Sequence, residues 1–454
     1  MKTYSLTARA LPLDDSWDVI VAGGGPAGCT AAAAAAREGA RTLLIESTGC
    51  LGGAGTSALV PAWCPFSDKE KLVYRGLAQR VFEASKSGEA HLGEKDWDWV
   101  PIDPERLKGV YDDLVTGSGA TVLFHTFLAS VERDSDGVSS LLVANKNGLS
   151  ALRAKVYVDC TGDADICGWG GADFHKGNES GEMMPATHCF VRTNIDEYAF
   201  RYLYNNGNRL HSGNKKSPIY DIIESGRYPL IPDAHCCSSL IGPRTVGFNA
   251  GHIWNVDNTD AASVSGALVS GRKIAREYRN ALAEFCPEAF GNAFLMMTGS
   301  VVGIRETRRV VGDYVLTLDD YLARRSFPDE ICRNSYFIDV HRAFAEVKKS
   351  LETRTTGDDI RYGPGESHGI PYRSLLPKGL RNVLVAGRSI SCERIVQGSV
   401  RVMPVCLAMG EAAGLAAALA AGSDHDVHQV DTELLRSRLK AHGAWLPDVD
   451  SAGS

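Results

Sequence analysis

The feature that most constrains this chain is a glycine-rich turn close to its beginning. Gly23, Gly25 and Gly28 follow a short apolar strand at 18–22 and lead into an alanine-rich helix at 29–37. A second apolar strand follows and closes on Glu46. Such a strand–helix–strand unit predicts a parallel sheet with helices packed on its faces.

The spacing of these glycines is typical of a dinucleotide-binding turn. Glycines let the backbone approach a pyrophosphate, and the N-terminus of the following helix stabilises its negative charge. Glu46 stands where an acid accepts the ribose hydroxyls and disfavours a 2′-phosphate. The alternative is a tight turn without a ligand, which leaves the acid unexplained.

The next part of the chain predicts a helix at 103–117 and three strands at 121–127, 138–144 and 152–158. Turn residues between the strands favour a small antiparallel meander. The composition changes after residue 181, where aromatic, His, Arg and Asn residues mix in irregular segments. This stretch reads as an inserted domain, with helices expected near 260–284 and 342–351. A last strand at 382–386 and an apolar helix at 404–421 return to the first domain.

Composition excludes several classes of protein. The chain has 454 residues, 44% of them hydrophobic, which is enough for a large core and too apolar for a disordered chain. A net charge of −7 argues against nucleic-acid binding, and no apolar stretch predicts a membrane span. The N-terminus lacks a secretory signal, so we expect a cytoplasmic protein. The 12 cysteines contain no Cys-x-x-Cys pair, and we predict no metal site.

Four further blocks, together with Gly23–Gly28 and Glu46, carry a family resemblance. The blocks lie at 158–165, 303–309, 370–377 and 399–404. The chain resembles the FAD-binding half of the glutathione-reductase-like flavoproteins. More narrowly, it resembles the FAD-dependent oxidoreductase family that is related to fumarate-reductase-like and thiazole-synthase-like flavoproteins. The resemblance covers about residues 17–422 and implies FAD as the cofactor. Noncovalent binding is the default expectation, and a covalent link through a His or Cys stays open.

The resemblance implies an α/β fold in which a Rossmann-like FAD-binding domain, a parallel sheet plus a β-meander, is interrupted by an α+β substrate-binding domain. The expected divisions are an extension at 1–16, FAD-binding segments at 17–181 and 376–425, a substrate or cap domain at 182–375, and a tail at 426–454.

The residues expected to hold the FAD lie in four places along the chain: the glycine-rich turn, the segment that begins at Glu46, the meander with the turn that follows it, and the segment from the last strand to the start of the last helix. They are Gly23, Gly25, Pro26, Ala27, Gly28, Glu46, Ser47, Gly52, Gly53, Ala54, Thr56, Leu128, Thr161, Gly162, Gly387, Arg388, Arg401, Val402 and Met403.

Two absences in the sequence point to the type of reaction. No second glycine-rich unit predicts a separate NAD(P)H domain, and no redox cysteine pair follows Glu46. Electrons are therefore expected to come from the substrate and to leave to oxygen, a quinone or a partner protein. We predict a dehydrogenase or oxidase that takes a hydride from a sugar, polyol or hydroxy acid onto flavin N5. The alternatives are a flavin-dependent reductase of an unsaturated carboxylate and an electron-relay subunit, and the oligomeric state stays open.

Four residues are candidates for catalysis. His341, two residues from Asp339, is the first candidate for the base, because histidine titrates near neutral pH. His368 is the second candidate, and Tyr372 could orient a hydroxyl. Arg305 could bind a carboxylate through its guanidinium fork. The structural alternatives are a hydrogen-bonded structural histidine and, for Arg305 and the arginines that follow it, an internal salt-bridge network.

Overall fold

The computed structural model describes residues 3–4, 7, 9–87, 92–93, 95–205, 210–211, 213–341 and 361–448. A seven-stranded sheet forms the frame, with strand order β3-β2-β1-β6-β5-β4 and β15 paired to β6. Its first unit is β1 (Leu13–Ala22), α1 (Pro26–Arg37) and β2 (Thr42–Ile45), with β1 and β2 parallel. The α/β fold class is confirmed. The first strand begins earlier than predicted, because its outer half also pairs with β6.

The meander differs from the sequence prediction at its first strand. The segment predicted as one strand at 121–127 divides into β3 (Thr121–Leu123) and the start of β4 (Phe127–Arg133). β3 pairs in parallel with β2, so it extends the parallel sheet and is not part of the meander. The antiparallel strands are β4, β5 (Val138–Asn145) and β6 (Gly148–Asp159). Assigning 121–127 to the meander was therefore wrong, because short strands of both kinds have the same local pattern.

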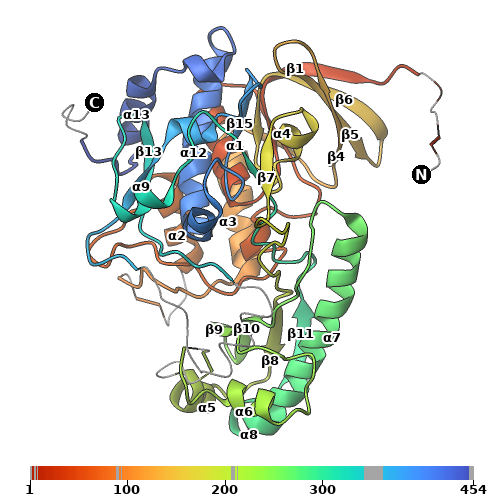
Figure 1. Ribbon diagram of the computed structural model, residues 1–454, viewed down its shortest axis with the longest axis vertical. Coiled ribbons are helices and arrows are strands. Elements are labelled where there is room, and N and C mark those ends of the chain that lie inside the picture. Colours follow the sequence, from red (N-terminus) through yellow and green to blue (C-terminus); the bar gives the residue numbers. More distant parts are fainter. Residues whose placement is uncertain are drawn as a thin grey trace.

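One long apolar helix forms the centre of the larger core. α12 (Met403–Ala421) packs along α1, and its backbone comes so close that a Cβ at Gly410 would lie 2.1 Å from the Ala27 carbonyl oxygen. Among the described residues it is the one helix long and apolar enough to cross a membrane, but 89% of that stretch is buried inside the protein. Core packing therefore accounts for its apolar composition, and it lies between the sheet and the outer helices in Figure 1.

The inserted part builds a second core of its own. A four-stranded antiparallel sheet, in the order β11-β8-β10-β9, carries the long helix α7 (Ala261–Phe285) against one side. Figure 1 shows this part below the larger one, with α7 running along its edge. The helix predicted near 260–284 is confirmed by α7. The helix predicted at 342–351 lies outside the described residues.

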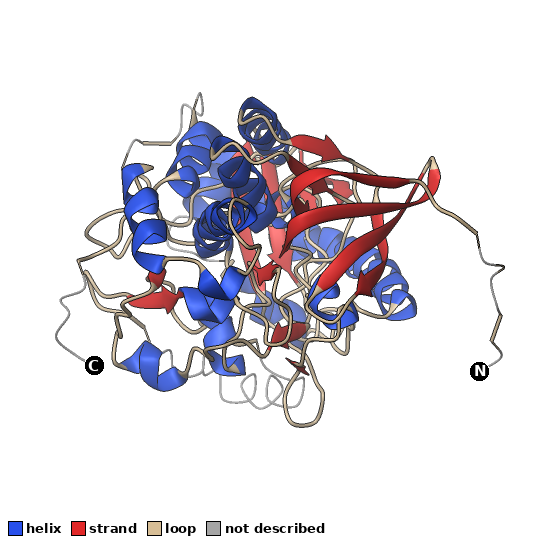
Figure 2. Ribbon diagram, turned by 90° about the horizontal axis from the view of Figure 1, so that it is seen from above, coloured by secondary structure: helices blue, strands red, loops and turns tan. Residues whose placement is uncertain are grey.

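The strands of the four-stranded sheet are β8 (Phe190–Thr193), β9 (Cys236–Gly242), β10 (Thr245–Ala250) and β11 (Phe294–Thr298), and β15 (Val383–Val385) completes the seven-stranded sheet. The remaining elements connect and cover the two cores, as the view from above in Figure 2 shows. They are α2 (Leu77–Lys86), α3 (Pro104–Gly117), α4 (Asp165–Trp169), β7 (Phe174–Lys176), α5 (Glu197–Ala199), α6 (Pro218–Glu224), α8 (Pro287–Phe290), β12 (Arg308–Val310), α9 (Leu318–Leu322), β13 (Glu330–Asn334), β14 (His368–Pro371), α11 (Arg394–Val400) and α13 (Thr432–Ala441). Short helical turns occur at Gly53–Gly55, Phe200–Asn205, Tyr372–Leu375 and Val427–Gln429.

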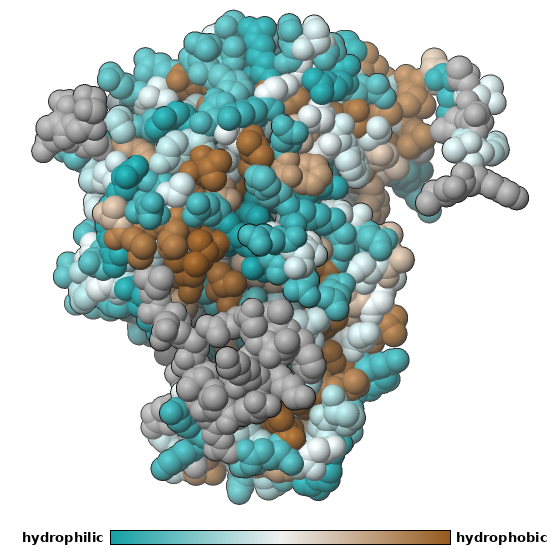
Figure 3. All heavy atoms as spheres, in the orientation of Figure 1, coloured by the Kyte–Doolittle hydropathy of each residue, from teal (hydrophilic) through white to brown (hydrophobic). Residues whose placement is uncertain are grey.

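Hydrophilic side chains dominate the upper part of the face seen in Figure 3. Hydrophobic patches on this face gather lower down, around the middle of the view. The apolar residues of the described helices and strands lie mainly in the two cores, as expected for a folded protein.

Candidate functional site

A large cavity of about 1460 Å³ lies between the two cores, and residues of both line it. Small-molecule pockets are usually about 300–1,000 Å³. This cavity therefore has room for an extended ligand together with a second, smaller one. Its two ends differ in chemistry, and we describe them in turn.

The glycine-rich turn forms one wall of the cavity, and each glycine has its own physical reason. Gly23 has φ +96°, and a Cβ there would lie 2.4 Å from the carbonyl oxygen of Cys160. A Cβ at Gly28 would lie 1.7 Å from the carbonyl oxygen of Gly23, so this glycine allows the helix to pack on the strand. A Cβ at Gly25 would meet no protein atom within 4 Å. Gly25 therefore leaves its space free for a ligand at the start of α1, where no side chain caps the helix.

Glu46 lies at the end of β2 and lines the same wall. Its carboxylate accepts hydrogen bonds from the backbone N–H of Gly24 at 2.6 Å and of Thr48 at 2.7 Å. These bonds fix the carboxylate beside the glycine-rich turn. Oε1 also accepts from the Ser47 hydroxyl at 3.3 Å, whereas Oε2 still has a free acceptor position, so Glu46 can receive a ribose hydroxyl as predicted.

Most of the residues predicted to hold the cofactor line this cavity. They are Gly23, Gly25, Pro26, Ala27, Glu46, Ser47, Gly53, Ala54, Leu128, Thr161, Gly162, Gly387, Arg388, Arg401, Val402 and Met403. Gly28, Gly52 and Thr56 are placed behind the wall. Gly52 has φ +98° and packs against Tyr111, and the Thr56 hydroxyl donates to the Leu51 carbonyl at 2.6 Å. These three residues shape the wall from behind.

Two arginines predicted for the cofactor are held by carboxylates. Arg388 donates to Asp163 at 2.7 Å, and its guanidinium lies over Gly162. Arg401 donates to the carbonyl and the carboxylate of Asp339 at 2.8 and 3.0 Å. Arg401 also adjoins the start of α12, where no side chain caps the helix. The N-termini of α1 and α12 thus both offer free N–H groups to this cavity.

The comparison with known families agrees with this geometry. The sequence profile described as FAD dependent oxidoreductase matches residues 18–439. The chain belongs to this family. FAD is its cofactor, and the open space at Gly25, the uncapped helix N-termini and Glu46 suit the diphosphate and ribose of that molecule.

Three solved structures are similar to this chain at a low level. A geranylgeranyl bacteriochlorophyll reductase-like protein from Thermoplasma acidophilum is 13% identical, with a TM-score of 0.46, covering 95% of this chain and 84% of that one. The OxyS anhydrotetracycline hydroxylase from Streptomyces rimosus is 14% identical, with a TM-score of 0.46 and coverages of 94% and 66%. The p-nitrophenol 4-monooxygenase from Pseudomonas putida DLL-E4 is 12% identical, with a TM-score of 0.41 and coverages of 97% and 91%. Likeness at this level does not indicate a substrate.

The other end of the cavity in this FAD-dependent oxidoreductase carries histidines. His341 lines it, as predicted for a base, and its Nε2 lies 3.4 Å from a carboxylate oxygen of Asp339. Burial, reinforced by the charge of Arg305, lowers the pKa of His341 to about 3. The ring is therefore neutral at pH 7 and has the protonation state that a base requires.

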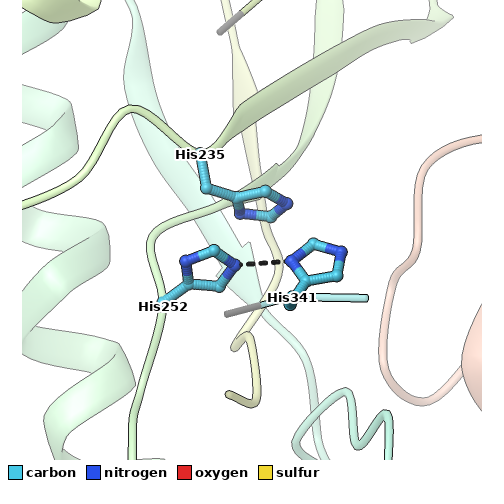
Figure 4. Close-up of side chains that lie close together, drawn as sticks. All are labelled: His235, His252 and His341. Carbon is cyan, nitrogen blue, oxygen red and sulfur yellow. Dashed lines mark hydrogen bonds between the residues drawn. The ribbon is translucent and has the colours of Figure 1, made fainter. Parts of the chain in front are cut away.

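Three residues outside the four predicted catalytic candidates share this end of the cavity. His252 Nε2 and His341 Nδ1 are 2.8 Å apart, and His235 stacks on His252 with ring centroids 4.2 Å apart (Figure 4). Asp233 lies 3.2 Å from His252 Nδ1. Only the folding of the inserted domain brings residues 233–252 against residue 341, so no local pattern in the sequence could indicate this cluster.

The arginines between 305 and 309 divide between the two sequence interpretations. Arg309 pairs with Glu306 at 2.6 Å, and Arg308 pairs with Asp165 at 2.7 Å, so both belong to an internal network. Arg305 instead lines the cavity, where it donates to the carbonyl of Pro185 and the hydroxyl of Thr187. The block at 303–309 therefore contains both a cavity residue, Arg305, and two residues of an internal ion-pair network, Arg308 and Arg309.

His368 and Tyr372 lie outside the cavity lining, contrary to the expectation that they join the site. His368 is fully buried on β14, and its Nδ1 is hydrogen-bonded to the Tyr362 hydroxyl at 2.6 Å. The Tyr372 hydroxyl donates to the Val427 carbonyl at 2.8 Å. Both side chains contact the core of the larger part, and we assign neither to the reaction.

Replacing Glu46 with alanine is expected to weaken FAD binding by about 10- to 150-fold. The ribose loses charge-assisted hydrogen bonds worth about 1.5–3 kcal/mol. Flavin release followed by fluorescence measures the change. Glu105, exposed on α3, gives the matched control, because Glu105→Ala removes a carboxylate far from the cavity wall. Equal flavin affinity in the two variants would remove Glu46 from the ribose site.

Burial of His368 predicts a dependence of stability on pH. Burial lowers its pKa to about 3, so the folded state excludes a proton that the unfolded chain binds below about pH 6.5. The stabilisation is fully present above pH 6.5 and is lost as the pH falls toward 3. In His368→Gln, the free energy of unfolding should change less with pH in this window, with a slope lower by up to about 1.4 kcal/mol per pH unit. Denaturant unfolding of both proteins at several pH values measures it, and parallel curves would contradict it.

Proposed function

We propose that this FAD-dependent oxidoreductase oxidises a small hydroxylated substrate, and that hydroxy acids suit its site better than neutral sugars or polyols. The observation that carries the proposal is a buried cation, Arg305, beside neutral histidines at one end of the cavity. A carboxylate and a hydroxyl on neighbouring carbons match these two kinds of group.

Arg305 supports the carboxylate. It is 7% exposed, and among the described residues no carboxylate forms an ion pair with it. Burial lowers its pKa to about 10, so the guanidinium stays charged at neutral pH. A substrate carboxylate would supply the missing counter-charge through a charge-assisted hydrogen bond.

The histidines support oxidation. When FAD is bound it accepts a hydride from the substrate carbon. The hydroxyl must lose its proton at the same time, and its O–H electron pair then forms the C=O bond. Neutral His341 can hold that proton, with Asp339 stabilising the imidazolium. The electrons leave afterwards to oxygen, a quinone or a partner protein.

The reductase alternative uses the same Arg305 but needs the opposite proton transfer. Reduction of an unsaturated acid requires a group that donates a proton to carbon. The low pKa of His341 makes it a poor proton donor at neutral pH, because the ring carries no extra proton there. This protonation state favours oxidation over reduction, and no contact in the described part favours a pure electron-relay role.

An anaerobic substrate panel with an Arg305 variant tests the proposal. We expect hydroxy acids to bleach the flavin of the wild type faster than the matching polyols. Arg305→Met should raise KM for the hydroxy acid by about 10- to 150-fold and change KM for the matching polyols much less, because only the hydroxy acid loses a carboxylate contact. Turnover only with a reduced dye and an unsaturated acid would instead establish the reductase function.

A further inference from the structure

Four side chains at the histidine end of the cavity form one continuous line. Asp233 Oδ1 lies 3.2 Å from His252 Nδ1, His252 Nε2 lies 2.8 Å from His341 Nδ1, and His341 Nε2 lies 3.4 Å from Asp339 Oδ2. Figure 4 shows the two central rings joined by the short contact, with His235 above them. Every ring nitrogen of His252 and His341 thus faces another member of the line.

The two neutral histidines have one proton fewer than the three contacts of this line require. Three contacts need three bridging protons, because carboxylates and ring lone pairs only accept. Two neutral imidazoles supply two protons. If each ring donates to its own carboxylate, the lone pairs of His252 Nε2 and His341 Nδ1 face each other at 2.8 Å. If His252 donates to His341 instead, a lone pair of His252 Nδ1 faces the Asp233 carboxylate.

The polar atoms at the Asp233 end are the ones left unsatisfied. Asp233 is 2% exposed, and its Oδ2 has no hydrogen-bond partner. Its Oδ1 accepts from the backbone N–H of His235 at 2.7 Å and also faces His252 Nδ1, which is buried without a hydrogen bond. Leaving such atoms unpaired is costly in a buried site. One additional proton between His252 Nδ1 and Asp233 Oδ1 would satisfy the nitrogen.

The charged groups around the line come from several segments. Arg401 and the Tyr336 hydroxyl donate to Asp339 at 3.0 and 3.2 Å, and the charge of Arg305 opposes protonation of His341. His235 adds to that opposition when it is charged, and His211 in turn opposes protonation of His235. The carboxylates at the two ends of the line, buried Asp233 and partly exposed Asp339, favour protonation of the histidines between them.

We propose that Asp233, His252, His341 and Asp339 can take up one additional proton, which they share, and so act as a single proton acceptor. In the reaction, this unit takes the proton that the substrate hydroxyl releases as the carbonyl forms. Asp233 and His252 are positioning residues that act through His341. The catalytic use of the proton rests on the proposed function, whereas the shared proton itself does not.

The same three histidines could be taken for a metal site, but the geometry favours a proton. Two nitrogens bound to a zinc ion at about 2.0–2.1 Å in a tetrahedral site lie about 3.3 Å apart, whereas His252 and His341 are at hydrogen-bond distance. The His235 ring stacks on His252 and does not meet it edge to edge at a common centre. Arg305 also lies 3.4 Å from His235 Nε2, which places a cation where a metal ion would need a lone pair.

NMR of the FAD-loaded protein with ¹⁵N-labelled histidine rings tests the proposal without any substrate. We expect the His252 and His341 signals to shift together in one step that takes up one proton. Asp233→Asn should lower the midpoint of that step by about 1–3 pH units, because it removes the negative charge at one end. His252→Gln should leave a His341 signal that titrates alone.

Asp313→Asn is the matched control. Asp313 also forms a carboxylate–histidine contact, with its Oδ2 2.7 Å from His428 Nδ1, but this pair lies outside the cavity lining. It should leave the His252 and His341 step unchanged. Two separate one-proton steps, an unchanged midpoint in Asp233→Asn, or one bound metal ion per protein by elemental analysis would each overturn the proposal. A failed substrate panel with an intact shared proton would refute only the proposed function.

Discussion

Replacing His341 with alanine is expected to slow reduction of the bound flavin by a hydroxy acid by about 10²- to 10⁴-fold at neutral pH, the range that a general base contributes. The variant loses the ring that Asp339 and His252 hold in place, so the hydroxyl proton has no acceptor at this point. Flavin content should not change, because His341 belongs to the histidine end of the cavity and not to the glycine-rich wall.

Anaerobic stopped-flow measurement of the oxidised-flavin absorbance gives this rate directly. His368→Gln is the matched control, since it changes another buried histidine outside the cavity lining and should reduce its flavin at the wild-type rate. A normal rate in His341→Ala with flavin fully bound would exclude His341 as the base.

Replacing Gly414 with valine is expected to destabilise the protein by about 3 kcal/mol or more. Overpacking of a filled core typically costs 1–3 kcal/mol. Here a Cβ alone would lie 2.0 Å from the Ala31 carbonyl oxygen, which is backbone and cannot turn aside. The helices α1 and α12 would have to separate, and the N-termini of both face the cofactor cavity. FAD affinity should therefore fall together with stability.

Denaturant unfolding and flavin titration of the same preparation measure both effects. Ala418→Val adds the same side chain to α12 at a partly buried position and serves as the control, with an expected change below that of Gly414→Val. Equal stability of the two variants would show that α1 and α12 can repack at this crossing without cost.

The elements that the sequence predicted well are those with strong local signals. The glycine-rich turn, the alanine-rich helix and the apolar strand before Glu46 predicted β1, α1 and β2 because glycine geometry and helix propensity act within a few residues. The strand at 121–127 was placed wrongly because its partner, β2, is far away in the sequence. Strand pairing depends on that partner and not on the strand's own residues.

The candidate site divides in the same way. Glu46 and Gly25 could be assigned from the sequence, since their roles follow from the spacing of one motif. His341 was a correct choice of cavity residue, but His368 has the same residue type and lies in the core. Burial decides between them, and burial is a property of the whole fold.

By itself the sequence determined the nucleotide-binding half of this protein, because glycines without side chains and a single acid define the backbone path that a dinucleotide needs. Only the tertiary structure decided what stands at the far end of the cavity. It brought Asp233, His252 and Asp339 around His341 from segments up to about a hundred residues apart, and it left Arg305 facing the cavity while Arg308 and Arg309 joined ion pairs. The physical reason is that a proton or a carboxylate is held by distances of a few ångströms between side chains, and the order of residues along the chain does not determine those distances.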